Sequence, residues 1–139
     1  MSTEADQVAG ELSSLVFQVT ARLRAEFNAA GVALDLPPAQ ALVLANLSEP
    51  SPMRDLAEWL SCEPSNVTGI VDGLERRGLV TRQPDPVDRR VKLVVLTEEG
   101  ERRRAELRSR SHAQAIALFD LPSDDRQQLR DLLVRVLGP

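Results

Sequence analysis

Cysteine and histidine occur once each among the 139 residues, and tyrosine is absent. One cysteine excludes an intramolecular disulfide, which fits a reducing cytoplasm, and one histidine excludes a metal site built from several histidines. The chain lacks the run of about 18 apolar residues that a membrane-spanning helix needs, and its acidic start lacks the apolar core of a signal peptide. These absences predict a cytoplasmic protein with no metal, no cofactor and no membrane partner.

Motifs typical of enzymes are missing as well. There is no glycine-rich phosphate loop, no nucleophile elbow and no metal-ligand spacing, so catalysis is not expected. A net charge of −4 argues against a nucleic-acid partner, but the charge is uneven. Residues 76–110 hold eleven Lys or Arg and six Asp or Glu, a balance of +5, and the rest of the chain carries −9. Because DNA binding responds to a local basic patch, this distribution leaves a DNA partner open.

Apolar residues at spacings of three and four predict a long first helix that ends near Gly31. A second helix is expected to begin at the two prolines 37–38 and to stop before residue 50. Ser51 then has the character of an N-cap for a short third helix, with Pro52 at its first position. After a tight turn at 61–63, Pro64 opens a fourth helix, and two short helices joined in this way form a helix-turn-helix.

Two short strands are expected at 79–82 and 91–96, joined by a turn rich in proline and aspartate. A hairpin directly after a helix-turn-helix is a wing. Arg89 and Arg90 stand at the mouth of its second strand, where turn geometry does not require arginine. Beyond the wing, Thr97 is predicted to cap a helix that runs to about residue 119, and a last amphipathic helix is expected at 123–137.

The fourth helix carries short polar side chains opposite its apolar stripe. At a helix N-terminus such groups can reach base edges in a major groove, and the free N–H groups of the first turn suit phosphate. Ordinary capping and solvation would also explain them, but the wing that follows favours DNA. The candidate DNA-binding residues of this helix are Ser65, Asn66, Thr68, Gly69 and Arg76. Asp72 and Gly73 are expected to face outward with them. Close approach of the backbone to DNA and plain tolerance both remain open as explanations of the two glycines.

The stretch 53–100 resembles the MarR family of bacterial winged helix-turn-helix regulators, most specifically at 71–80 and in the wing from Asp85 onward. The resemblance implies a homodimer that is mainly α with a small β-hairpin wing, its terminal helices interlocked across a two-fold axis. It also implies that Arg90 enters a minor groove of DNA and that Asp88 orients it. Arg89, expected to meet phosphate or solvent, and Lys92 complete the candidate DNA-binding residues.

Three positions depart from the family pattern. Val87 replaces a residue that is often basic, and Gly69 and Gly73 stand where the family often carries arginine. The resemblance therefore implies fewer phosphate contacts from the fourth helix, which means either weaker binding or more reliance on the wing.

The sequence predicts one domain over 1–139, with dimerisation helices at about 4–30 and 98–137 and a DNA-binding winged-helix lobe at about 36–97. The expected function is a transcriptional repressor that binds double-stranded DNA as a homodimer on a pseudo-palindromic operator. A small-molecule effector that releases the DNA is compatible with the resemblance, although no residue is assigned to it. The alternatives are a winged-helix module that binds protein and a thiol redox sensor of the same fold that uses Cys62.

Overall fold

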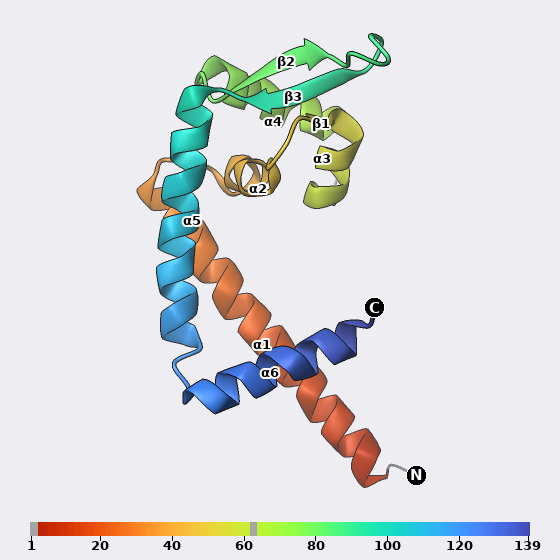
Figure 1. Cartoon of the computed structure of the whole chain (residues 1–139), viewed down its shortest axis with the longest axis vertical. Helices are drawn as coiled ribbons and strands as arrows, with labels where there is room; N and C mark the ends of the chain where they lie inside the picture. Colours follow the sequence, from red (N-terminus) through yellow and green to blue (C-terminus); the bar gives the residue numbers. More distant parts are fainter. Residues whose placement is uncertain (1–2, 62–63) are drawn as a thin grey trace.

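The computed structural model describes residues 3–61 and 64–139 and contains six helices and three strands within them (Figure 1). The elements follow in this order: α1 (Glu4–Ala33), α2 (Pro38–Asn46), β1 (Ser51–Pro52), α3 (Met53–Leu60), α4 (Pro64–Arg76), β2 (Val80–Pro84), β3 (Lys92–Leu96), α5 (Glu98–Leu118) and α6 (Ser123–Leu137). The predicted fold class, mainly α with a small β wing, is confirmed.

The sheet has three antiparallel strands in the order β1-β3-β2, where the sequence predicted a two-stranded hairpin. The extra strand contains Ser51 and Pro52, which pair with Val94 and Leu93. The prediction of Ser51 as a helix N-cap is therefore wrong: Pro52 occupies the N-cap of α3, and the Ser51 hydroxyl donates to the Glu49 carbonyl at 2.9 Å. A strand of two residues is too short to show the alternation of apolar and polar residues that identifies a strand, so the sequence did not predict β1.

The core lies between α2, α3, α4, the sheet and the first half of α5. Its side chains, all buried, include Leu44, Leu56, Val67, Val71, Leu74, Val94 and Leu107. Three of these come from α4, because apolar residues at i, i+4 and i+7 share one helix face. The buried face fixes which side of α4 remains available for a partner.

Thr97 joins the wing to α5, as the sequence predicted. Its hydroxyl accepts from the Gly100 backbone at 3.0 Å and donates to the Gly78 carbonyl at 2.6 Å. Gly100 is required here, since a Cβ at this position would lie 2.0 Å from the Leu79 carbonyl oxygen. The first turn of α5 is thus packed directly against the start of β2.

Figure 1 shows α1 extending away from the lobe and α5 running from the lobe to α6, which lies apart from the lobe and across α1 in this view. The end of α1 is joined to α5 by Arg103, whose guanidinium donates to the Leu34 carbonyl at 2.9 Å. Within the described part of the chain, α6 packs extensively against no other element. No helix among the described residues is long and apolar enough to cross a membrane.

Candidate nucleic-acid interface

The exposed side of α4 carries the candidate residues of the helix. Ser65, Asn66, Thr68, Gly69 and Arg76 are all exposed. Their opposite face is anchored by Val67 and Leu74, both fully buried. A helix fixed in this way presents its polar N-terminal half as a rigid edge, which is what insertion into a groove requires.

Gly73 does not face outward, contrary to the sequence prediction. It is buried, and a Cβ there would lie 2.8 Å from the Gln40 amide nitrogen. The Gln40 amide oxygen in turn accepts from Arg77 at 2.8 Å. Gly73 therefore gives α2 room to approach α4, and it has no contact surface to offer DNA.

Gly69, by contrast, is exposed and has open space where a Cβ would stand. Gly69→Ala should raise the free energy of unfolding by about 0.8–1 kcal/mol, the helix-propensity difference, measurable by urea denaturation. We also expect weaker DNA binding in an anisotropy titration, because the added methyl group would lie on the exposed face of α4 that is predicted to meet DNA. Gly10→Ala in α1, another open helical glycine, is the matched control and should stabilise without changing DNA affinity. A more stable Gly69→Ala protein that binds DNA as tightly as the wild type would show that Gly69 is merely tolerated.

The tip of the wing is ordered by its two aspartates. An Asp85 carboxylate oxygen accepts from the Val87 backbone at 2.9 Å, and the Asp85 backbone donates to the Val91 carbonyl at 2.9 Å. The Arg90 backbone donates to the Asp88 carboxylate at 3.2 Å. The bonds from Val87 to Asp85 and from Arg90 to Asp88 are Asx turns, and with the Asp85–Val91 backbone bond they fix the tip beyond the paired strands.

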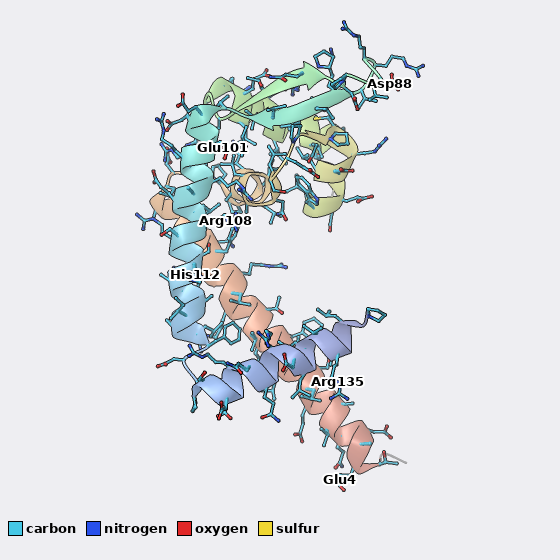
Figure 2. All side chains as sticks on the ribbon, viewed as in Figure 1. Glu4, Asp88, Glu101, Arg108, His112 and Arg135 are labelled. Carbon is cyan, nitrogen blue, oxygen red and sulfur yellow. The ribbon has the colours of Figure 1, made fainter. Side chains whose placement is uncertain are left out.

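Arg89 and Arg90 lie in this turn, before β3 begins at Lys92. The Val91 backbone donates to the Asp88 carbonyl at 3.0 Å and closes a turn there, so the two arginines precede the paired part of the hairpin. Arg89, Arg90 and Lys92 are all exposed. Figure 2 shows Asp88 at the end of the hairpin that is far from α5.

Asp88 holds the Arg90 side chain in place. The Arg90 Nε atom donates to Asp88 Oδ1 at 3.1 Å, and a terminal guanidinium nitrogen donates to Oδ2 at 3.4 Å. The Arg90 side chain is nevertheless 91% exposed. The side-chain and backbone hydrogen bonds from Arg90 lower the pKa of Asp88 below its ordinary value. The guanidinium is thus pre-oriented and still free to enter a groove.

Arg82 was not singled out by sequence reasoning. From β2 it reaches α4, where it donates to Asp72 at 2.5 Å and to Glu75 at 3.2 Å. Neither strand alternation nor helical periodicity links residues on two different elements, so the sequence held no direct signal for this contact.

A cavity of about 640 Å³ separates α1 from α2 and α3. Its lining includes Arg24, Phe27, Asn28, Leu42 and Trp59. Cys62, the residue of the redox-sensor hypothesis, lies outside the described residues.

The short helix α3, the second helix α4 with its polar face, and a hairpin whose tip carries Arg90 held by Asp88 define a winged helix-turn-helix protein of the DNA-binding class. Residues 36–92 match the model of the MarR family. CouR from Rhodococcus jostii RHA1, whose crystal structure has p-coumaroyl-CoA bound, is 33% identical, with 94% of each chain covered and a TM-score of 0.75. A MarR-family transcriptional regulator from Rhodococcus sp. RHA1 is 32% identical, with 100% of this chain and 98% of that chain covered and a TM-score of 0.72.

The HTH-type transcriptional repressor MdtR of Bacillus subtilis strain 168 is 30% identical over 99 residues, which are 70% of this chain and 64% of MdtR. The match thus spans less than two thirds of that relative's own length. The chain belongs to the MarR family of transcriptional regulators.

Proposed function

We propose that the protein is a transcriptional repressor that acts in the cytoplasm as a homodimer on a pseudo-palindromic operator. In this proposal residues 36–97 form the DNA-binding lobe, with α4 in a major groove and the wing tip in the neighbouring minor groove. The observation that carries the proposal is the guanidinium of Arg90, which is exposed at the tip of the wing and held by Asp88. Such a side chain suits a narrow minor groove, where the negative potential is strongest. Arg82 joins the wing to the polar helix α4. We expect the protein to have no catalytic activity.

The homodimer is supported by apolar side chains that the single chain leaves exposed on α1 and α6. They include Leu12, Leu15, Val19, Leu132, Leu133 and Val136. Two-fold symmetry would place the two copies of α4 about one helical turn of DNA apart, about 10 base pairs from centre to centre.

Release by a small-molecule effector is a second part of the proposal. The cavity between α1 and the lobe contains Arg24 and Asn28 beside apolar side chains, a combination that can orient a ligand with a polar head. CouR, with its bound CoA ester, supports an effector of this general kind without identifying it.

The direct test is to select DNA from a random library with the purified protein and to sequence what it retains. A two-fold-related motif with half-sites about one turn apart is expected. A reporter gene placed behind the selected sequence should be silenced when the protein is expressed. Retained sequences with no shared motif, or a reporter that is switched on, would contradict the proposal.

Asn66→Ala should reduce discrimination at one base pair in each half-site by about 1 kcal/mol, since an asparagine amide can pair with an adenine edge in the major groove. The measurement is a competition titration in which each position of the selected operator is changed in turn. Asn46→Ala is the matched control, because that amide lies on α2 and donates to the Leu42 carbonyl. An unchanged preference in the Asn66→Ala protein would mean that α4 meets DNA in another orientation.

A further inference from the structure

A carboxylate stands in the middle of the face that α4 turns to DNA. Residues 65, 69, 72 and 76 are spaced by four, three and four positions, so Ser65, Gly69, Asp72 and Arg76 form one stripe along the helix. Glu75 borders the same stripe. The side chains of Asp72 and Glu75 are each 44% exposed. Left alone, two negative charges on this face would repel phosphate.

Arg82, on the neighbouring strand β2, forms ion pairs with both Asp72 and Glu75. One terminal nitrogen of its guanidinium lies 2.5 Å from an Asp72 oxygen, and the other lies 3.2 Å from a Glu75 oxygen. The first nitrogen also approaches the Thr68 carbonyl at 3.5 Å. The Arg82 side chain is only 25% exposed, against 91% for Arg90. A guanidinium held by two carboxylates and a carbonyl has few donors left for DNA.

We propose that Arg82 is a positioning residue for DNA recognition, which neutralises Asp72 and Glu75 and so makes the face of α4 acceptable to phosphate. The inference rests on the proposed function, because it requires α4 to face DNA. Arg82 acts through the recognition helix and makes no contact with DNA itself. Its effect differs from that of Arg90, which acts from an exposed position on the wing.

The test compares three proteins by anisotropy titration on the selected operator, after circular dichroism and light scattering have checked folding and assembly. Arg82→Gln should weaken binding by about tenfold or more, because it uncovers two like charges facing phosphate. Combining Arg82→Gln with Asp72→Asn and Glu75→Gln should return the affinity to within about threefold of the wild type, since no charge is then uncovered. Arg102→Gln, which removes the same charge from a pair with Glu99 on α5, is the matched control and should bind like the wild type.

A folded triple variant as weak as Arg82→Gln would overturn the inference, since Arg82 would then contact DNA or serve only as a tie between β2 and α4. If Arg82→Gln does not fold, the double variant Asp72→Asn/Glu75→Gln tests the inference in its place. It keeps Arg82 and should bind more tightly, with a steeper dependence on salt, whereas weaker binding would overturn the inference. An Arg82→Gln protein that binds like the wild type, while Arg90→Ala is impaired, would overturn this inference alone. Failure of the wild type to select any motif would instead remove the proposed function.

Discussion

Leu133→Asp should convert the proposed dimer to a monomer at micromolar concentration. Leu133 lies on α6, is 41% exposed in the single chain, and shares its helix face with Leu132 and Val136. Burying a leucine contributes about 1.5–3 kcal/mol, and two-fold symmetry counts the residue twice, so the dimer should lose about 3–6 kcal/mol. That loss raises the dissociation constant by about two to four decades. Light scattering would measure the mass, and an operator titration should show binding lost with it.

The matched control is Gln127→Asp, which adds the same charge to the same helix. Position 127 lies about 120° around α6 from position 133 at 100° per residue, away from the apolar face, so the control should remain a dimer and bind the operator. A Leu133→Asp protein that keeps the dimer mass would mean that this face of α6 is covered by something other than a second copy. A wild type that is monomeric at micromolar concentration would contradict the dimer itself.

The helices of the lobe could be predicted from the sequence because each has one buried face. The stripe at 67, 70, 71 and 74 is a local pattern, and so is the cap at Thr97, where a hydroxyl meets an N–H group three residues away. The Asp88–Arg90 pair was implied by the resemblance, and the structure brings the two side chains together. The DNA-binding role of that pair stays a prediction.

The contacts that sequence reasoning missed join different elements. Gly73 faces Gln40 on α2, and Arg82 faces Asp72 from β2. A helical wheel places residue 73 near the edge of the polar face, and only the approach of α2 decides that it is buried. In the same way, alternation places Arg82 on the same face of β2 as the buried Val80, and only the position of α4 decides that Arg82 meets Asp72 and Glu75 there.

Arg90→Ala should weaken operator binding by about 100-fold or more without changing the folded dimer, since about 1.4 kcal/mol lost at each of two half-sites multiplies to that factor. The side chain is 91% exposed and makes no contact with the core, so thermal unfolding should be unaffected. Arg89→Ala is the matched control: it removes the same charge from the adjacent residue, which has no carboxylate partner among the described residues. An equal loss of operator affinity in the two variants would mean that Arg90 contributes only its charge.

Asp88→Asn tests whether Asp88 orients the Arg90 side chain for DNA binding. Asparagine keeps an oxygen that can accept from the Arg90 backbone and so preserves the Asx turn, but it removes the charged partner of the guanidinium. If only net charge mattered, losing a carboxylate near DNA would tighten binding at every salt concentration. If Asp88 orients the Arg90 side chain, Asp88→Asn should weaken binding, and Asp88→Ala should weaken it further because the turn is lost as well.

Because hydrogen bonds from Arg90 lower the pKa of Asp88, the carboxylate remains charged to a more acidic pH than an isolated aspartate. The wild type should therefore keep its affinity advantage over Asp88→Asn as the pH falls through the ordinary range of aspartate, and lose it only below the lowered pKa. Titrations of the three proteins over a salt series and a pH series measure both effects, and tighter binding by Asp88→Asn at every salt concentration would refute the orienting role.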